Sequence, residues 1–569
     1  MKNNNVRQAQ LKPLLLSLSQ AAIVLASLPA SVAFAQTVVP GAGQIIQQVP
    51  QPATPTPSRP GVTIQQPAPA PAASSAPFMV RTIEITGNTV FPTATLKPLV
   101  AEGEGKTITL AQLDALALRI TEYYRTRGYP LTRAIIPAQT LTAGTVRLQV
   151  LETKYGQVRL ENSTKVSDAT LTSTLSPLQA GQLLSQDSLD RALLLLSDYP
   201  GVAVNATLSP GSAVGTTDLN IRTVPSNAPI GNVYMDSYGS KYTGRVRLGA
   251  NLDLNNLLGR GDVLSLSGLT STHNLAYARL GYQIPVNGNG TRVGAALSAL
   301  EYRLGDSLKP LGANGKATIA SLWASHPVIR SIDRNLYVRF GYDHKEFQDR
   351  IDTTGLNNER DTDAVTLEAS ADQRDSVFNG GITTASVSAT AGRLKFKNAA
   401  AEAADTATAN TRGSYSKFNA AIARTQAITP SSTVYVGLSG QYTKDNLDSS
   451  EQVVMGGPGS VRGYGVGTLS GGSGYLVTAE FRQRLSLFPS SGTWQAIAFV
   501  DSGHVKINAN QWVAGPNTAT LSGAGVGLNW AGYEGWTAKF DIAAPFGSTP
   551  TLVGTRDKHW GWVQVGKSF

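Results

Sequence analysis

The residue with the clearest chemical potential in this sequence is an arginine within a glycine-rich stretch. Residues 455–467 read Met-Gly-Gly-Pro-Gly-Ser-Val-Arg-Gly-Tyr-Gly-Val-Gly. This density of glycine and proline excludes a regular helix or strand and allows tight turns with positive φ. Arg462 is the only charged residue between Glu451 and Glu480. The stretch is therefore either an ordinary Gly-rich hairpin loop or a loop whose backbone places one guanidinium at a defined position.

Other patterns that could support catalysis or cofactor binding fail on their context. Residues 561–568 match the spacing of a phosphate-binding loop, but that motif needs a following helix, and only Phe569 remains. The five histidines do not have the spacing of metal ligands. The sequence also shows no pairing of a nucleophile with a base. We therefore expect no catalytic, cofactor-binding or metal-binding residues, and no cofactor.

Composition narrows the class of protein further. The chain has 569 residues, which predicts several domains, and it has no cysteine, which excludes disulfides and thiolate sites. Its formal net charge is +10, but Lys and Arg are scattered rather than clustered, which argues against a nucleic-acid-binding surface. Only 15% of residues are charged and 56 are glycine. This balance is typical of alternating strands rather than charged helices.

Residues 1–35 have the pattern of a secretory signal peptide. Three basic residues precede an apolar segment from Leu14 to Leu28, and Ala33-Phe34-Ala35 matches an A-x-A cleavage site. The apolar segment is interrupted by polar residues and is too short to span ~30 Å of hydrocarbon. A membrane anchor is therefore the weaker interpretation, and we expect a mature chain that begins at Gln36.

Residues 36–77 form an N-terminal segment rich in Pro, Ala, Gln and Thr. Such a composition predicts an extended linker without a packed core. A short island, Gly-Gln-Ile-Ile-Gln-Gln-Val at residues 43–49, lies near the start of this segment, between Gly41 and Pro50.

Two small α/β modules are predicted at residues 78–153 and 154–226, each on a β-α-α-β-β plan. In the first module, Thr109 and Gln112 form a capping box at the start of a helix with apolar residues on one face. In the second module, Ser185 begins a comparable helix. From pattern alone, the two modules could also be α/β domains without a joint function.

From residue 227 to residue 569 the pattern changes to strands, about sixteen in number. Between Arg245 and Leu254, for example, apolar residues alternate with polar, charged or glycine residues, so that one face suits lipid and the other water. A soluble sandwich would alternate as well, but no helical segment intervenes to cover an apolar face.

All seven tryptophans lie in this region, which predicts an interfacial aromatic girdle. The terminal Phe569 is also typical of bacterial outer-membrane barrels. The predicted fold is a membrane β-barrel of about sixteen antiparallel strands after two small α/β domains.

Two short motifs in the strand region resemble those of outer-membrane protein-transport barrels. One is similar to the signature of their inward-folded loop, and the other to their inner-wall motif F-x-D-x-G: Val461, Arg462, Gly463 and Tyr464, and Phe499, Asp501 and Gly503. Two modules before a barrel resemble the two-partner secretion transporters (TpsB type) of the haemolysin and filamentous-adhesin secretion family. The resemblance implies that the modules are POTRA (polypeptide-transport-associated) domains and that the inward loop covers about residues 447–474. It also makes residues 43–49 a candidate plug helix.

The resemblance further implies an ion pair inside the barrel between Arg462 and Asp501. Alternation places Phe499, Asp501 and Gly503 on one face, and because a carboxylate is costly in lipid, that face should line the lumen. Arginine presents a planar fork that can bind a carboxylate through two hydrogen bonds. Glu480 is a second candidate lumen partner. Alternatively, these are ordinary lumen charges that face water and contribute little individually.

The resemblance implies an outer-membrane translocator with its POTRA domains in the periplasm. It would capture an unfolded exoprotein, by adding a strand to a module edge, and export it through the pore. The expected substrate is an adhesin, a haemolysin or a contact-dependent toxin. The other expected partner is outer-membrane lipid, with no nucleic acid, and the barrel should be monomeric. Two alternatives remain: an assembly factor for outer-membrane proteins, which usually carries more modules, and a passive porin, which needs none.

Overall fold

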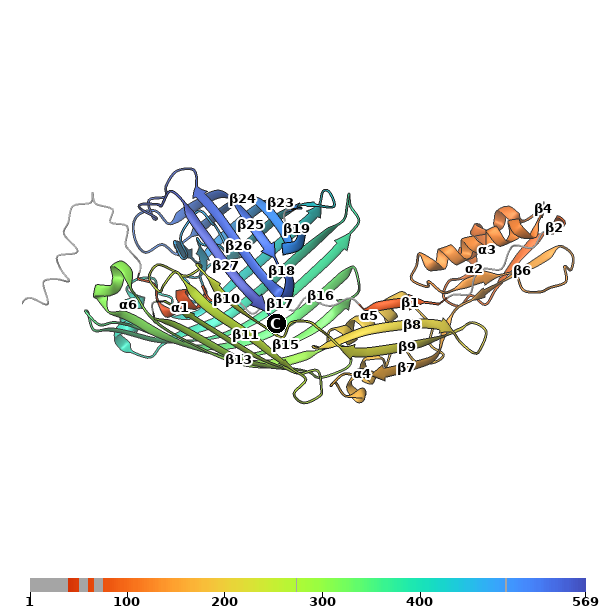
Figure 1. Ribbon diagram of the computed structural model, residues 1–569, viewed down its shortest axis with the longest axis horizontal. Coiled ribbons are helices and arrows are strands. Elements are labelled where there is room, and N and C mark those ends of the chain that lie inside the picture. Colours follow the sequence, from red (N-terminus) through yellow and green to blue (C-terminus); the bar gives the residue numbers. More distant parts are fainter. Residues whose placement is uncertain (1–38, 51–59, 66–74, 273, 487–488) are drawn as a thin grey trace, which may run out of the picture.

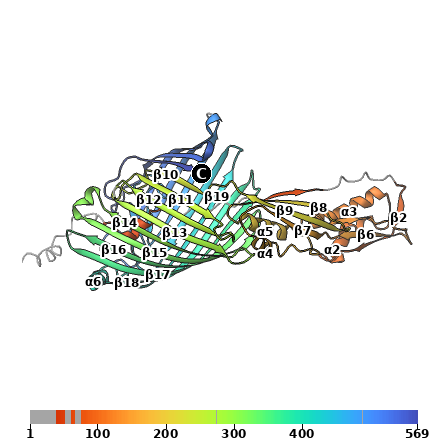
Figure 2. The same ribbon diagram turned by 60° about the horizontal axis from the view of Figure 1, so that its bottom comes forward.

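The computed structural model shows a β-barrel with two smaller modules that extend from one of its ends (Figures 1 and 2). The structure describes residues 39–50, 60–65, 75–272, 274–486 and 489–569. The predicted signal peptide, residues 1–35, lies outside the described residues. The second module lies directly against the barrel and the first lies farther out, while the helix α6 (Ala399–Thr406) lies at the opposite end. None of the helices in the described residues is both long and apolar enough to cross a membrane.

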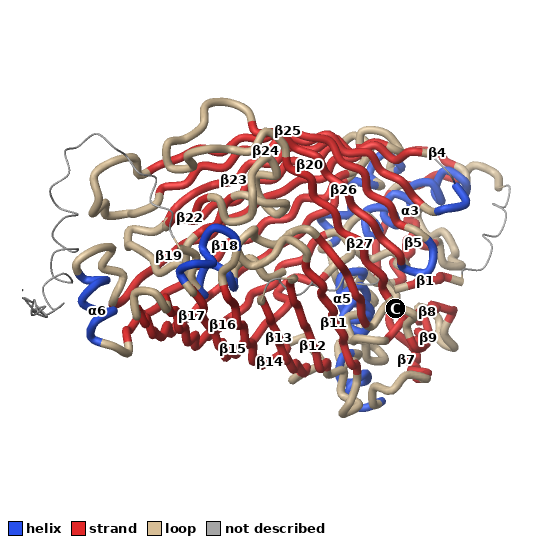
Figure 3. Tube along the Cα trace, turned by 60° about the vertical axis from the view of Figure 1, so that its left-hand side comes forward, coloured by secondary structure: helices blue, strands red, loops and turns tan. Residues whose placement is uncertain are grey.

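The barrel consists of sixteen antiparallel strands that follow one another in chain order (Figure 3). The first strand pairs with the last, from Asn232 opposite Ser568 to Asp236 opposite Gln564, and this pairing closes the barrel. Its strands are β10 (Gly231–Asp236), β11 (Arg247–Asn255), β12 (Val263–Ser271), β13 (Leu275–Pro285), β14 (Arg292–Arg303), β15 (Ala313–Arg330), β16 (Arg334–Ile351), β17 (Leu356–Asp375), β18 (Gly381–Phe396), β19 (Gly413–Ala427), β20 (Ser432–Tyr442), β23 (Ser473–Leu485), β24 (Thr493–Lys506), β25 (Thr518–Ala531), β26 (Trp536–Pro545) and β27 (Trp560–Ser568).

The outer surface of the barrel is apolar, as a surface in contact with lipid must be. Leu248, Phe340 and Val436 belong to the alternating apolar sets of β11, β16 and β20, and they are 56%, 50% and 48% exposed. Side chains of opposite character point inward because successive residues of a strand face opposite sides. The predicted fold class, a membrane barrel of sixteen strands after two α/β modules, is confirmed.

The first module has its own hydrophobic core under a three-stranded sheet of order β3-β6-β5. The helix α3 begins at the predicted capping box, in which Thr109 and Gln112 satisfy each other's backbone N–H groups. The elements of this module are β2 (Phe78–Val80), β3 (Thr82–Thr86), α2 (Thr93–Leu96), η2 (Lys97–Leu99), η3 (Ala101–Gly103), β4 (Lys106–Ile108), α3 (Leu110–Arg125), β5 (Arg133–Ile135) and β6 (Thr145–Leu151).

The second module repeats this plan with a separate core. Its elements are β7 (Lys154–Asn162), α4 (Asp168–Thr174), α5 (Gln186–Ser197), β8 (Val202–Pro210) and β9 (Thr216–Pro225). Its sheet has a fourth strand that the sequence analysis did not predict: β1 (Gly61–Ile64) from the Pro-rich linker, in the order β1-β8-β9-β7. Without β1, the edge of β8 would present unpaired backbone groups, which even a short extended segment such as β1 can satisfy.

Polar contacts fix the second module to the barrel. Arg330 at the end of β15 binds Asp198 through two hydrogen bonds of 2.7 and 2.9 Å, and its side chain is only 3% exposed. The turn between β11 and β12 adds a hydrogen bond of 2.7 Å from Asn256 to the carbonyl of Pro200. Ser167 donates its backbone N–H to the carbonyl of Gly259 in the same turn. The module is therefore anchored to the turns that face it.

A buried carboxylate links a loop of the first module to its helix α3. The Oε1 atom of Glu152 accepts hydrogen bonds from the backbone N–H groups of Thr89 (2.7 Å) and Val90 (2.8 Å) and from the hydroxyl of Tyr124 (2.7 Å). Burial opposes ionisation, but a hydrogen bond from the Thr89 hydroxyl, together with the bonds above, outweighs it and lowers the pKa of Glu152 below its ordinary value. The ionised carboxylate therefore stabilises the folded module.

We predict that Glu152→Gln destabilises the soluble fragment of residues 75–226 by about 1–3 kcal/mol at pH 7, because buried donors lose a charged acceptor. The folded pKa is lowered, so the contribution of Glu152 is complete above the unfolded pKa of about 4.3. It is lost as pH falls through the folded pKa. Urea unfolding at several pH values should show a difference between the proteins that shrinks below about pH 4. The exposed Glu161→Gln should have no effect, and a constant difference down to acid pH would contradict the account.

Candidate functional site in the barrel lumen

The loop between β20 and β23 folds back on itself inside the barrel. Its two short strands, β21 (Val453–Met455) and β22 (Leu469–Gly471), pair with each other. Gly456 and Gly457 follow β21 with φ angles of +98° and +106°, which only glycine adopts readily. Beyond this bend, the backbone N–H of Gly457 donates to the carbonyl of Tyr464 over 2.9 Å. The glycine-rich composition thus produces a defined turn that carries Arg462 at its tip.

Arg462 forms a two-pronged contact with Asp501 on the wall strand β24. Its Nε and Nη2 atoms each lie 2.8 Å from a different carboxylate oxygen, and its backbone N–H donates to the same carboxylate over 3.2 Å. Asp501 is 0% exposed and Arg462 is 7% exposed. The structure therefore brings together the two residues that the sequence analysis paired, and it satisfies the buried carboxylate from one residue of the loop.

Glu480 on β23 binds the remaining side of the same guanidinium. The Nη1 atom of Arg462 lies 2.8 Å from Oε1 of Glu480, and Arg482 binds the other oxygen of Glu480 at 2.6 Å. We call Arg462, Asp501, Glu480 and Arg482 the lumen ion-pair cluster. It contains two positive and two negative side chains, so the charges of the loop tip and the wall compensate each other without an external ion.

The other residues of the wall motif provide the surface on which the loop tip lies. The guanidinium carbon of Arg462 lies 3.4 Å from the ring centroid of Phe499, a favourable position for a cation over an aromatic face. A Cβ atom at Gly503 would lie only 3.0 Å from the sulfur of Met455 and 3.1 Å from a methyl group of Val461. The motif F-x-D-x-G thus supplies an aromatic face, a carboxylate and a position without a side chain, and the inward loop packs against all three.

Glycines on both sides allow the loop backbone to approach the wall closely. A Cβ atom at Gly463 would lie 3.0 Å from the backbone nitrogen of Pro545 on β26. A Cβ atom at Gly523 on β25 would lie 3.0 Å from the Cα atom of Gly463. Tyr464, the last residue of the loop motif, is 2% exposed and belongs to the apolar cluster under the loop. Any larger residue at position 463 would therefore push the loop away from the wall.

Trp562 is a site residue that the sequence analysis missed. Its indole N–H donates to the carbonyl of Arg462 over 2.9 Å, and its ring is 1% exposed. The ring of Trp560 stacks on it at 5.2 Å between centroids. The expectation that all seven tryptophans form an interfacial girdle is therefore wrong for Trp560 and Trp562, which both face the inward loop. Trp562 follows Trp560 by two residues, so both rings lie on one face of β27. This spacing was the sequence signal that the two tryptophans belong together.

A short helix from the N-terminal segment lies inside the barrel, over part of the island at residues 43–49. The helix α1 (Ala42–Ile46) packs Ala42 and Ile45, which are 0% and 1% exposed, against wall residues such as Leu300 and Phe347. Gly43 is in close contact with the inward loop, because a Cβ atom there would lie 2.6 Å from the nitrogen of Ser450. The helix therefore touches both the wall and the loop.

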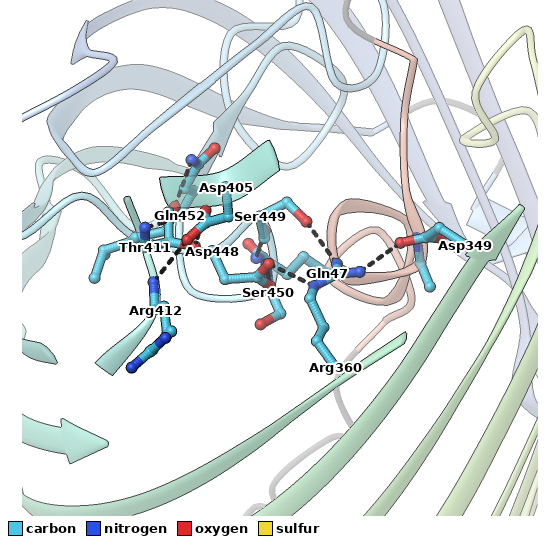
Figure 4. Close-up of polar contacts among 12 residues, drawn as sticks. Gln47, Asp349, Arg360, Asp405, Thr411, Arg412, Asp448, Ser449, Ser450 and Gln452 are labelled. Atoms are coloured by element: carbon cyan, nitrogen blue, oxygen red, sulfur yellow. Dashed lines mark hydrogen bonds and ion pairs between the residues drawn. The ribbon is translucent and has the colours of Figure 1, made fainter. Parts of the chain in front are cut away.

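Hydrogen bonds and ion pairs join the helix, the wall and the loop (Figure 4). The backbone N–H of Ala42 donates to Asp349 over 2.7 Å, and the side chain of Gln47 donates to the carbonyl of Ser449 over 2.7 Å. Arg360 on β17 binds Asp349 at 2.7 Å and Asp448 of the loop at 2.6 Å. We call Asp349, Arg360, Asp448 and Ser449 the plug network. A change in the position of α1 must disturb Asp349, and one of the other partners of Asp349 is Arg360, which also holds the loop.

These features together define a class of protein: an outer-membrane polypeptide transporter with a loop held inside its barrel and small α/β modules before it. A family model described as haemolysin secretion/activation protein ShlB/FhaC/HecB matches residues 215–530. A second model, described as POTRA domain, ShlB-type, matches residues 78–153. The chain belongs to the ShlB/FhaC/HecB family of haemolysin secretion/activation proteins.

Individual relatives agree with this assignment. The heme/hemopexin transporter protein HuxB of Haemophilus influenzae is 29% identical over 471 residues, which is 82% of each chain. The outer membrane transporter CdiB of Dickeya dadantii is 25% identical over 478 residues, 82% of this chain and 83% of that one. The solved structure of CdiB from Escherichia coli superposes with a TM-score of 0.71 at 23% identity, and the match covers 89% of this chain and 93% of that one. This structural likeness shows the fold.

The chain is thus a two-partner secretion transporter of the bacterial outer membrane that exports an exoprotein, and its POTRA domains lie in the periplasm. This confirms the family, the function and the location that the motifs implied.

We predict that Arg462→Ala impairs export far more than insertion of the barrel. Removal of one partner from a buried ion pair costs about 3–5 kcal/mol of stability. Here the lost stability is that of the loop in its present position, so the loop should move while the barrel stays folded. Arg462→Lys should restore export only in part, because an ammonium group cannot contact both oxygens of Asp501 in the same way. Secreted exoprotein should be measured at matched surface abundance for Arg462→Ala, Asp501→Ala and the double variant.

If the two residues act as a unit, the double variant should be little worse than either single variant. Strictly additive losses would contradict this prediction. The matched control is Arg424→Ala, because Arg424 binds Asp375 through two hydrogen bonds of 2.8 and 3.0 Å between wall strands. This variant removes the same kind of contact without touching the loop, and export should stay near the wild-type level.

Proposed function

We propose that the structure is the closed state of the transporter and that export requires α1 and the tip of the inward loop to move. The observation that carries this proposal is the plug network, in which Arg360 binds Asp349 beside α1 and Asp448 of the loop. Both segments occupy the inside of the barrel, so a polypeptide could pass only after they rearrange. Because Asp349 accepts the N–H of Ala42 in α1 and also binds Arg360, movement of α1 weakens the contact that holds the base of the loop.

The base of the inward loop has a second buried contact with the wall. Glu451 is 2% exposed and binds Lys345 of β16 at 2.6 Å and Lys417 of β19 at 2.9 Å. Arg360 binds Asp349, which also accepts a hydrogen bond from α1, whereas Glu451 has no hydrogen bond or ion pair with α1 among the interactions of the described residues. We propose that Glu451 keeps the loop base in place while the loop tip, held by the lumen ion-pair cluster, changes position.

We propose that the periplasmic modules capture the exoprotein before it enters the barrel. Both modules extend from the end of the barrel at which Arg330 binds Asp198 (Figure 1). Their small sheets have edge strands, and an extended polypeptide can be bound through its backbone at such an edge. The energy for export would come from folding of the exoprotein outside the cell, because the only phosphate-loop spacing, residues 561–568, lies in strand β27 and not before a helix.

The proposed substrate is a large adhesin, haemolysin or contact-dependent toxin. Support comes from the family description, haemolysin secretion/activation, and from the transporter names of the relatives. We further infer that the chain acts as a transporter without catalysis and that the barrel functions as a monomer, since β10 and β27 close it within one chain. Family membership favours export over the two alternatives, assembly of outer-membrane proteins and passive diffusion.

Co-expression with a candidate exoprotein tests the proposal. The full-length chain should release the exoprotein into the medium, while deletion of residues 78–226 should abolish release and leave a heat-modifiable barrel in the outer membrane. Replacement of α6, residues 399–406, by a short Gly-Ser loop is the matched control and should leave release unchanged. Normal release by the deletion variant would contradict capture by the modules. Large constitutive conductance of the purified wild-type barrel would contradict the closed state and favour a porin.

A further inference from the structure

Strand β1 belongs to the second module's sheet through its backbone and not through its side chains. It pairs in parallel with β8, from Gly61 opposite Asn205 to Ile64 opposite Leu208, and the N–H of Gln65 donates to the carbonyl of Leu208 over 2.9 Å. All four of its residues are exposed, including Val62 at 42% and Ile64 at 46%. None of them is part of the module's core. The pairing is therefore weak for its length, since a parallel pair without buried side chains depends on main-chain hydrogen bonds alone.

Strand β8, to which β1 is bound, does not depend on β1 for its packing or for its pairing with the rest of the sheet. Val202, Val204, Ala206 and Leu208 of β8 are all buried in the core of the module, and on its other edge β8 pairs with β9 along its whole length, from Val202 to Pro210. Removal of β1 would leave the module folded with an open edge of backbone N–H and C=O groups. An open edge of this kind binds another extended chain readily.

We propose that the edge of β8 is the docking site for an extended segment of the exoprotein and that β1 is a built-in occupant which this segment displaces. The proposal rests on the proposed export function and assigns a site to the capture step. The bound segment would run parallel to β8. A Cβ atom at the position of Gly61 would lie 2.9 Å from the side-chain oxygen of Asn205, which is exposed and can turn aside, so this position selects only weakly by size. At the next positions the side chains of the bound segment face solvent, as those of β1 do, so the site tolerates many sequences.

The position of β1 in the chain connects this exchange to the lumen. Residues 47–60 join α1 inside the barrel to β1 on the module. A chain extends at most about 3.3–3.6 Å per residue, so pairing of β1 with β8 limits how far α1 can move from the barrel. Displacement of β1 lengthens this tether. Binding of the exoprotein at the edge of β8 thereby favours the departure of α1 from the plug network.

The first test measures exchange at the edge directly, with purified full-length protein and a fluorescein-labelled peptide of residues 60–65. Because the N–H of Gln65 points to β8, alternation places the N–H of Thr63 toward β8 and that of Val62 away from it. Thr63→Pro removes a donor to β8, and Val62→Pro is the matched control. If β1 occupies the edge, Thr63→Pro should bind the peptide at least about ten-fold more tightly than Val62→Pro. Equal binding by the two variants, or no binding by either, would overturn the proposal.

The second test locks β1 in place in secreting cells. The chain has no cysteine, so a double cysteine variant can form one disulfide at a chosen place. Thr63 and Thr207 are paired residues of β1 and β8, and the variant is Thr63→Cys with Thr207→Cys. The oxidised variant should lose export and reductant should restore it. The control, Thr207→Cys with Asn220→Cys, joins β8 to β9 and should export normally. Normal export by the locked variant would overturn the proposal. If the wild-type chain exports nothing, the proposed function fails, while the peptide measurement still decides whether the edge exchanges.

Discussion

The ion pair between Arg462 and Asp501 is the contact on which the arrangement of the lumen depends. Asp501 is fully buried on the wall, and a buried carboxylate without a partner is strongly unfavourable. Its partner is delivered by a loop that crosses the lumen, so the requirement to neutralise the wall also fixes the loop. The glycines at positions 463, 503 and 523 do not attract the loop; they remove the side chains that would keep it from reaching the carboxylate.

The inside of the barrel is thus filled by two segments whose polar contacts meet at the wall. The loop tip is held by the lumen ion-pair cluster, and α1 is held by the plug network, which reaches the base of the same loop through Arg360. On the periplasmic side, β1 joins the chain that carries α1 to the sheet of the second module. The contacts at the module, at α1 and at the loop therefore lie in succession between the proposed capture site and the lumen.

Much of this architecture could be predicted because it depends on periodic patterns. Alternation identified the barrel and placed Asp501 and Glu480 on inward faces, and resemblance of two motifs paired Arg462 with Asp501. Other features could not be predicted, because they depend on which distant segments meet. The four-residue strand β1 is too short and too exposed to show a pattern, and the contacts of Arg360 require the position of α1 in the lumen. Trp562 was assigned to the membrane interface because tryptophan is common there, whereas its N–H is used by the backbone of Arg462.

The most direct test of the central claim is a measurement, by electron paramagnetic resonance in lipid bilayers, of the distance between the inward loop and the part of the wall beside Asp501. Spin labels can be attached at Gly459→Cys in the loop, where a side chain meets open space, and at Val526→Cys on the outer surface of β25, which is 57% exposed. The account predicts one narrow distance distribution in the otherwise wild-type chain and a broad one when Arg462→Ala or Asp501→Ala is added. A distribution that stays equally narrow in both variants would show that the ion pair does not hold the loop, and would contradict the account.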